Sequence, residues 1–205
     1  MLNIYLARHG QDEDNLNGIL NGRRDNPLTE KGIEQAEEAG SKAKELSLTF
    51  DKVYTSPLKR TCKTAEIIAE STNSPEPEVL EDLIERDFGV MTGKPTSSIE
   101  ESCAPDILKT DGITYFLSPE GAETFPDLIE RAKKVLSNIK NKHQDGNILL
   151  VTHGDFGKMV YAAYYDLDWK KVLTMFHFGN SEILRLSEDS SPEEAHVFEI
   201  EQHNL

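Results

Sequence analysis

Runs of apolar residues alternate with amphipathic stretches along this chain, and this alternation predicts a succession of strands and helices. The segments "NIYLA" and "NILLVT" are continuous and apolar, which is typical of strands buried on both faces of a sheet. The stretch "EQAEEAGSKAKEL" is rich in good helix formers and indicates a helix. The predicted strands cover 2–7, 52–55, about 79–81, 147–152, 181–187 and 195–201, and the predicted helices cover about 30–46, 58–70, 123–142 and 156–165.

Capping residues mark where these helices begin. Thr29 precedes the first helix, and Pro57 directly follows "DKVYTS", where Ser56 would cap a helix that starts at the proline. Because strands alternate with helices, we expect an α/β fold, a three-layer sandwich whose mostly parallel central sheet is flanked by helices. The segment 86–120 shows no long regular pattern. We therefore expect a single domain over 1–205, with this segment as a cap or insert.

The balance of charge narrows the range of partners. The 205 residues include 37 acidic and 22 basic side chains, a formal net charge of -15, and such a surface repels nucleic acid and anionic membranes. A small anionic substrate would therefore need a locally basic pocket. The sequence shows no apolar run near the roughly 20 residues of a membrane span, no signal peptide and no metal-binding cysteine spacing. We expect a cytoplasmic protein that binds neither nucleic acid nor membranes, and the oligomeric state stays open.

Two of the predicted strands end in the same dipeptide. "NIYLARHG" leads to His9 and "NILLVTHG" leads to His153, with Gly10 and Gly154 directly after them. In open α/β sheets, ligands bind beyond the carboxyl ends of the strands. If these two strands are neighbours, both histidines reach one place, and each glycine lets the backbone approach a ligand closely. A shared binding site and two unrelated strand-end histidines both fit this pattern.

Arginines near these histidines indicate the charge of the ligand. Arg8 precedes the first histidine, and Arg60 lies near the start of the helix after "VYTSP", where a guanidinium and the helix dipole can bind phosphate. A solvent-exposed helix charge is the other interpretation of Arg60. The acids of "QDEDN" raise the alternative of a cation site, but arginines beside both histidines would repel a divalent cation. We therefore expect an anion site, with Asp12 and the acids after it pointing outward.

Six motifs occur in a fixed order along the chain. They are "LARHGQDEDN" (6–15), "NGRRDNPLTEKGIEQA" (21–36), "YTSPLKRTCKTAEII" (54–68), "LIERDFGVMTG" (83–93), "PEGAETFPDLIERA" (119–132) and "ILLVTHGDFGKMV" (148–160). Each motif is modest alone, whereas the ordered set is specific and spans essentially the whole chain. The set resembles the histidine phosphatase superfamily, in its phosphoglycerate-mutase-like branch.

The resemblance implies a mechanism of phosphoryl transfer. It assigns His9 as the nucleophile, because a neutral imidazole offers a lone pair near pH 7. Arg8, Arg60 and His153 would place positive charge around the phosphoryl oxygens. Glu85, in "LIERDFG", would protonate the leaving group and later activate water. The resemblance implies neither a metal nor an organic cofactor.

Further residues match family positions around the substrate. By the resemblance, Asn15 reaches the phosphate with its side-chain amide. Asn21 and Gly22 line the substrate mouth, although a plain turn would also explain them. Arg86 either contacts a substrate anion or is a surface charge, and Gly154 borders the phosphate after the second histidine.

Two departures from the family pattern bear on function. Asp12 stands where a hydroxyl residue is usual, and the segment between Gly93 and Pro119 is shorter than the insertion of the mutases, which leaves a phosphohistidine open to water. We therefore expect a metal-independent phosphomonoesterase that acts through a phosphohistidine on a small phosphorylated metabolite. A phosphoglycerate mutase with the same site is the first alternative, and a non-catalytic phosphate-binding or regulatory protein is the second. Glu85 counts against the latter, because binding alone needs no proton donor.

Overall fold

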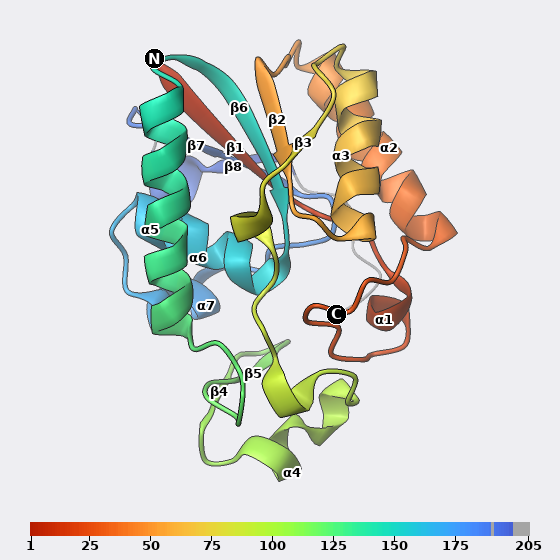
Figure 1. Cartoon of the computed structure of the whole chain (residues 1–205), viewed down its shortest axis with the longest axis vertical. Coiled ribbons are helices and arrows are strands. Elements are labelled where there is room, and N and C mark those ends of the chain that lie inside the picture. The colour runs from red at the N-terminus through yellow and green to blue at the C-terminus, as the bar shows by residue number, and fades with distance from the viewer. Residues whose placement is uncertain (190, 199–205) are drawn as a thin grey trace.

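A six-stranded sheet forms the centre of the molecule, whose computed structural model describes residues 1–189 and 191–198 (Figure 1). In spatial order its strands are β3 (Glu78–Val79), β2 (Lys52–Thr55), β6 (Gly146–Thr152), β1 (Leu2–Arg8), β7 (Ile183–Leu186) and β8 (His196–Phe198). The first four strands are parallel, β7 runs antiparallel to β1, and β8 runs antiparallel to β7. The predicted α/β fold with a mostly parallel sheet is confirmed.

Helices cover both faces of this sheet and complete the predicted three layers (Figure 1). One face carries α2 (Glu30–Glu45) and α3 (Lys59–Ser71), and the other carries α5 (Phe125–Lys142), α6 (Gly154–Tyr164) and α7 (Trp169–Met175). The seven-residue α7 and a short α1 (Glu13–Leu16) were not predicted. None of the helices that the structure describes is long and apolar enough to cross a membrane.

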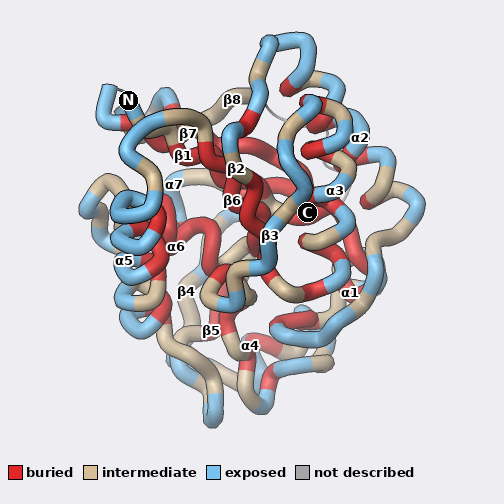
Figure 2. The backbone as a smooth tube through the Cα atoms, turned by 45° about the horizontal axis from the view of Figure 1, so that its top comes forward, coloured by how far each residue is buried: buried red, intermediate tan, exposed pale blue. Residues whose placement is uncertain are grey.

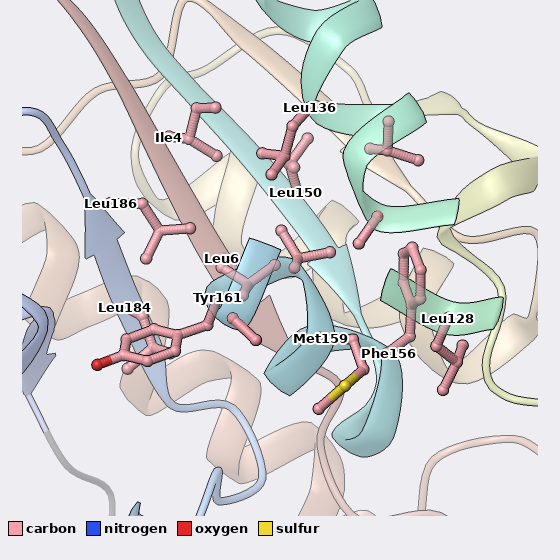
Figure 3. Close-up of a cluster of buried hydrophobic side chains, with 14 of the residues drawn as sticks. Ile4, Leu6, Leu128, Leu136, Leu150, Phe156, Met159, Tyr161, Leu184 and Leu186 are labelled. Atoms are coloured by element: carbon pink, nitrogen blue, oxygen red, sulfur yellow. The ribbon is translucent and has the colours of Figure 1, made fainter. Parts of the chain in front are cut away.

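Side chains of β1 alternate between the two helical layers. Ile4 and Leu6 belong to the apolar cluster beneath α5 and α6, whereas Tyr5 and Ala7 belong to the cluster beneath α2 and α3. Successive side chains of a strand point to opposite faces, so a strand between two layers is apolar throughout. Figure 3 shows the first cluster, and Figure 2 shows the buried strands at the centre of the fold.

Helix starts follow capping chemistry, with one correction. Thr29 caps α2 through its side chain, as predicted. α3 begins at Lys59 rather than at Pro57, and no side chain caps it, so the predicted cap by Ser56 is wrong. The Ser56 hydroxyl lies 2.8 Å from a ring nitrogen of His153 instead. This serine therefore belongs to the polar cluster at the edge of the sheet.

The segment 86–120 has more regular structure than its sequence indicates. It contains α4 (Ile99–Cys103) and a small hairpin of β4 (Ile107–Lys109) and β5 (Thr114–Phe116), joined by short 3-10 turns. These elements lie beyond the carboxyl ends of the strands, at the bottom of Figure 1. They have an apolar cluster of their own, formed by Leu20, Phe88, Met91, Ile99 and Phe116.

The two predicted C-terminal strands are present within the described residues. The strand predicted over 181–187 is β7, and the strand predicted over 195–201 is represented by β8. Positions 199–201 of that prediction lie outside the described residues. β7 lies beside β1 in the sheet, so the segment that precedes it reaches the same edge as the end of β1.

The carboxyl ends of three neighbouring parallel strands form the edge where the site lies. β1 and β6 pair directly, with Arg8 opposite Thr152. His9 and His153 therefore leave the sheet side by side, which confirms that the two His-Gly strands are neighbours. β2 pairs with the other side of β6 and brings Ser56 to the same edge.

Candidate active site

His9 and His153 face each other at this edge. Their ring centroids are 5.2 Å apart, the ring planes meet at 62°, and both side chains are buried. The backbone N–H of His9 donates to the carbonyl of Thr152 at 3.0 Å, which extends the pairing of β1 with β6. Gly10 allows the close turn that follows, because a Cβ there would lie 2.2 Å from the carbonyl oxygen of Gly32.

Arg60 joins the two histidines. Its Nε donates to Nε2 of His9 at 3.2 Å, and its Nη2 lies 3.2 Å from Nδ1 of His153. Two backbone carbonyls hold the same guanidinium, Arg24 at 2.5 Å and Gly22 at 2.8 Å. Since Arg60 is 0% exposed, the interpretation as a solvent-exposed helix charge is wrong. Gly22 has a φ of +48°, and its carbonyl accepts a hydrogen bond from Arg60. Gly22 therefore helps to hold the Arg60 guanidinium in place.

The hydrogen bonds of His9 fix its tautomer. Nδ1 lies 2.6 Å from the carbonyl oxygen of Gly10, and a carbonyl only accepts, so Nδ1 carries the proton. The lone pair is therefore on Nε2, which faces Arg60. Burial, with Arg60 and Arg8 nearby, holds the pKa of His9 well below its usual range. The imidazole is neutral at pH 7 and its Nε2 is a potential nucleophile.

His153 has the opposite tautomer. Arg60 has no lone pair to offer, so Nδ1 of His153 accepts from it, and Nε2 donates to the Ser56 hydroxyl at 2.8 Å. Burial and the charge of Arg60 lower the pKa of His153 well below its usual range. The fixed positive charge of the cluster therefore comes from the arginines. A phosphate dianion beside His153 would favour protonation of its ring.

Arg8 lies on the open side of the cluster. Its Nη1 donates to the carbonyl of Phe178 at 2.7 Å, whereas its buried Nε has no hydrogen-bond partner among the described residues. Buried donors without a partner are rare in native structures, and this nitrogen is able to donate to a bound anion. Gly154 is next to this nitrogen, since a Cβ there would lie 3.6 Å from Arg8 Nε and 4.0 Å from Glu85 Oε2. The glycine thus leaves space between a cation and a carboxyl group.

Glu85 is buried at the N-terminus of α6. Its Oε1 accepts hydrogen bonds from the backbone N–H groups of Arg86 at 2.8 Å and Phe156 at 3.1 Å. Burial, with the charge of Asp155, raises the pKa of Glu85 above its ordinary value. The shift increases the fraction of Glu85 that carries a proton at a given pH, which suits a proton donor.

Arg131, which the sequence analysis missed, holds the segment before Glu85. Its Nη1 donates to the carbonyls of Asp82 at 2.8 Å and Ile84 at 2.6 Å, and its Nε and Nη2 donate to Glu123 at 2.9 and 2.8 Å. The arginine lies nearly two turns inside α5, in the motif "LIERA", where the sequence pattern alone is that of an ordinary amphipathic helix. Its partners are distant in sequence, so their contact becomes visible only in the fold.

Asp12 points inward, so the expectation that it faces outward is wrong. The side chain is 0% exposed, and Oδ1 accepts from the backbone N–H of Asn15 at 2.7 Å. Oδ2 accepts from Asn21 at 2.9 Å and lies 3.4 Å from Nε of Arg60. The physical reason is helix capping, because Asp12 and Asn15 form a capping box at the start of α1. Asp12 therefore places a negative charge beside the arginine of the anion site.

The acids after Asp12 do not form a cation site. Asp14 is buried and binds Arg24 at 2.8 Å, so only Glu13 of the two points outward as expected. Among the described residues no three His, Cys, Asp or Glu side chains are grouped as ligands of one metal ion. The two buried acids of this loop are neutralised by arginines instead.

Two asparagines complete the wall beside His9. Asn180, another residue missed in the sequence, donates from Nδ2 to the carbonyl of His9 at 3.0 Å and lies 3.4 Å from Oδ1 of Asn15. Asn180 comes from the segment before β7, which reaches the site because β7 pairs with β1. Asn15 is thus linked to the His9 backbone through Asn180, and its backbone N–H donates to Asp12.

Arg86 is buried, which rules out its interpretation as a surface charge. It donates to three backbone carbonyls, those of Glu123 at 2.7 Å, Phe116 at 2.8 Å and Leu117 at 2.8 Å. Its guanidinium also stacks on aromatic rings, with Cζ 4.2 Å from the ring centroid of Phe125. In this structure Arg86 ties the segment 86–120 to α5, and its donors are directed at these carbonyls.

Two adjoining cavities lie beside the cluster, on the side of Arg8. The inner cavity, of about 170 Å³, reaches Glu85 and Gly154, and the outer cavity, of about 480 Å³, extends beneath the segment 86–120. Arg8 and Asn15 line both cavities. A ligand whose phosphate lies by Arg8 therefore has space for a larger group on the outer side.

The sequence matches the model of the histidine phosphatase superfamily (branch 1) over residues 4–200. The chain belongs to this superfamily. It is 30% identical over 179 residues, 84% of each chain, to the 2,3-bisphosphoglycerate-dependent phosphoglycerate mutase of Parvibaculum lavamentivorans. Among solved structures, the phosphoserine phosphatase of Entamoeba histolytica in complex with 3-phosphoglyceric acid is similar, with a TM-score of 0.73 and 26% identity over 90% of both chains. The product of an open reading frame of Mycobacterium tuberculosis has a TM-score of 0.75 and 28% identity over 90% of both chains.

These histidine phosphatase relatives confirm the resemblance found in the motifs, including its phosphoglycerate-mutase-like branch. The chain is an enzyme of the histidine phosphatase and phosphoglycerate mutase family. Some of these relatives are named mutases and others phosphatases, and both kinds are similar to this chain over most of their length.

Proposed function

We propose that this chain is a metal-independent phosphomonoesterase that transfers a phosphoryl group from a small phosphorylated metabolite to His9 and then to water. The main support is the state of His9, which is neutral and presents the Nε2 lone pair to Arg60. Glu85, a carboxyl group with a raised pKa, lies on the same site across Gly154. A nucleophile and a proton donor are thus available together.

In the first step, Nε2 of His9 attacks phosphorus while the bond from phosphorus to the ester oxygen breaks. The Glu85 carboxyl gives its proton to that leaving oxygen and becomes a carboxylate. Arg8 and Arg60 stabilise the charge on the phosphoryl oxygens. The unpartnered Nε of Arg8 gains an acceptor in this arrangement, and Arg60 exchanges its contact with His9 for the phosphoryl oxygens.

In the second step, water attacks the phosphorus of the phosphohistidine. The bond from phosphorus to Nε2 breaks, the electron pair returns to the imidazole, and the Glu85 carboxylate takes a proton from the water. Orthophosphate then leaves, and both side chains have their starting protonation states. A raised pKa suits Glu85 to both steps, since it increases the protonated fraction for the first step and makes the carboxylate a stronger base for the second.

The outer cavity favours hydrolysis over mutase activity. A mutase that uses a bisphosphate must bind a second strongly anionic group next to the transferred phosphoryl group. Of the described residues that line the outer cavity, Arg8 alone has a fixed positive charge, and it already serves the first phosphate. A phosphoglycerate mutase would use the same His9 site, but the described residues that line the outer cavity offer no second set of cations for it.

Glu85 also favours an enzyme over a protein that only binds phosphate. Burial of a carboxyl group near an anion site costs stability and weakens anion binding whenever the group is ionised. A phosphate-binding or regulatory protein would gain nothing from this cost. Proton transfer to a leaving group explains it directly.

Hydrolysis of p-nitrophenyl phosphate by wild type and His9→Ala tests the proposed function. We expect the substitution to abolish release of p-nitrophenol. His143→Ala is the matched control, because His143 lies at the far end of α5 and contacts Tyr54 rather than the site. Turnover that persists in His9→Ala would contradict the assignment of the nucleophile.

A further inference from the structure

The wall of the outer cavity is mostly neutral. Short hydroxyl side chains and branched apolar side chains line it, together with the amides of Asn15 and Asn180. The hydroxyl residues are Thr96, Ser97 and Thr114, and the apolar residues are Ile19, Ile99 and Ile113. Neutral donors and acceptors beside C–H surfaces recognise uncharged groups that carry hydroxyls.

Two basic residues near this wall are paired with acids. Arg24 is paired with Asp14 at 2.8 Å, and Lys109 of β4 is paired with Glu100. His177 lines both cavities, but burial lowers its pKa to about 4, so it is neutral at pH 7. Of the described residues that line the outer cavity, Arg8 alone has a fixed positive charge, and the phosphate itself needs it.

Lys158 lines the inner cavity, but its three donors have protein acceptors. Nζ donates to the hydroxyl of Tyr115 at 3.0 Å, to the carbonyl of Leu173 at 3.2 Å and to the carbonyl of Phe176. An ammonium has three donors, so none is left for a ligand. Burial also lowers the pKa of Lys158 to about 8, which weakens it as a permanent charge.

Asp155 adds a negative charge to the inner cavity. It lines that cavity together with Glu85, and its Oδ2 lies 3.4 Å from Nη1 of the fully buried Arg86. Because the two cavities share Arg8 and Asn15 in their walls, a leaving group that extends from the phosphate into the outer cavity begins beside the inner one. A carboxylate at that point would be repelled by Asp155, and the nearby Lys158 and Arg86 already donate to protein acceptors. Like charges at close range disfavour such a substrate.

We propose that the physiological substrate is a phosphomonoester whose remaining part is uncharged and rich in hydroxyl groups, of the sugar phosphate or polyol phosphate class. The inference rests on the proposed phosphatase function and deepens it. The hydroxyl and amide side chains of the outer cavity bind the hydroxyls of the leaving group, and the isoleucines pack against its C–H surfaces. Phosphorylated carboxylic acids such as phosphoglycerate and phosphoserine are disfavoured by Asp155 and by the neutral wall.

A matched pair of three-carbon esters tests this substrate class. Glycerol 3-phosphate and 3-phosphoglycerate differ by a hydroxymethyl group in place of a carboxylate. We expect kcat/KM to be at least about tenfold higher for glycerol 3-phosphate, a difference of roughly 1.4 kcal/mol. Equal values, a preference for 3-phosphoglycerate, or no hydrolysis of glycerol 3-phosphate would overturn the inference. His9-dependent hydrolysis of p-nitrophenyl phosphate in the same preparation shows whether the proposed function itself holds.

A positive charge introduced into the wall of the outer cavity should shift the substrate preference toward 3-phosphoglycerate. Ser97 is exposed at the rim of the outer cavity, so a longer side chain there has room. Ser97→Lys should raise the ratio of kcat/KM for 3-phosphoglycerate over glycerol 3-phosphate by about tenfold. Ser97→Met, the neutral control of similar length, removes the same hydroxyl, so the ratio in Ser97→Lys should exceed the ratio in Ser97→Met. An unchanged ratio in Ser97→Lys, or an equal rise in Ser97→Met, would count against a leaving group in this cavity.

Discussion

The carboxylate Oδ2 of Asp12 lies 3.4 Å from Nε of Arg60, and both side chains are 0% exposed. The same Nε donates to Nε2 of His9, so the carboxylate is close to the position that a transferred phosphoryl group needs. Asp12 offsets the charge of Arg60 in the absence of a substrate and repels an incoming phosphate dianion. Its effect on phosphate affinity can be measured.

Asp12→Asn should increase the affinity for phosphate. Removal of the negative charge leaves Arg60 free to interact with the anion, so the inhibition constants of orthophosphate and orthovanadate should fall by about tenfold. Asp14→Asn is the matched control, because Asp14 is buried in the same loop but pairs with Arg24. Unchanged or weaker inhibition in Asp12→Asn would show that its carboxylate does not compete with phosphate.

The same substitution should also change stability. Breaking a buried ion pair leaves Arg60 uncompensated, at a cost of about 3 kcal/mol in the free energy of unfolding. Saturating orthophosphate replaces the lost negative charge, so it should raise the Tm of Asp12→Asn more than that of wild type. Thermal unfolding with and without phosphate measures both effects. Equal phosphate-induced shifts in the two proteins would contradict the exchange of Asp12 for phosphate on Arg60.

Glu85→Gln should slow hydrolysis according to the leaving group. A poor leaving group such as an alkoxide needs the proton, so kcat for glycerol 3-phosphate should fall by about 10²–10⁴. p-Nitrophenolate leaves without full protonation, so kcat for p-nitrophenyl phosphate should fall much less. The measurement is a plot of log kcat against the pKa of the leaving group for both proteins. Parallel lines with the same slope would contradict a proton donor at this position.

The pH dependence of kcat/KM should follow from the protonation states of His9 and Glu85. His9 attacks only when neutral, and its pKa is lowered, so activity is lost only when the pH falls below that depressed value. Glu85 donates only when protonated, and its pKa is raised, so activity is lost as the pH rises through that elevated value. For glycerol 3-phosphate, kcat/KM should therefore decline on the alkaline side, and Glu85→Gln should lack this limb. An alkaline limb that persists in Glu85→Gln would assign it to the substrate or to another group.

Substitution of Arg86 shows whether this residue stabilises the fold or contacts a substrate anion. Its removal leaves the carbonyls of Phe116, Leu117 and Glu123 without their donors, each at a cost of about 1 kcal/mol or more. Arg86→Met should therefore lower the free energy of unfolding by about 3 kcal/mol in urea titrations. A raised KM with unchanged stability would instead support the predicted contact with a substrate anion.

The sequence was most informative where strands are continuous and buried. The apolar runs that end at His9 and His153 predicted both the parallel sheet and the meeting of the two histidines, because the carboxyl ends of neighbouring parallel strands share one edge. The direction of Asp12 could not be predicted in this way. It depends on a capping box of a four-residue helix, which is too short to produce a hydrophobic period.

The remaining site residues depend on contacts between distant segments. Asn180 reaches His9 because β7 pairs antiparallel with β1, and Arg131 reaches the loop before Glu85 because α5 packs beside it. Neither residue has a local pattern that separates it from an ordinary loop or helix position. α7 was missed for a related reason, since seven residues give fewer than two full turns of periodicity.

The central claim is a phosphoryl group on Nε2 of His9, and trapping with an alkaline, denaturing quench tests it most directly. Enzyme mixed with a phosphoryl-labelled substrate and stopped within the first turnover should carry label that is stable to base and lost in acid. Peptide mapping at alkaline pH should place this label on the peptide that contains His9, and His9→Ala should remain unlabelled. Active enzyme that hydrolyses the substrate without any label on His9, or that carries it on another residue, would contradict the account.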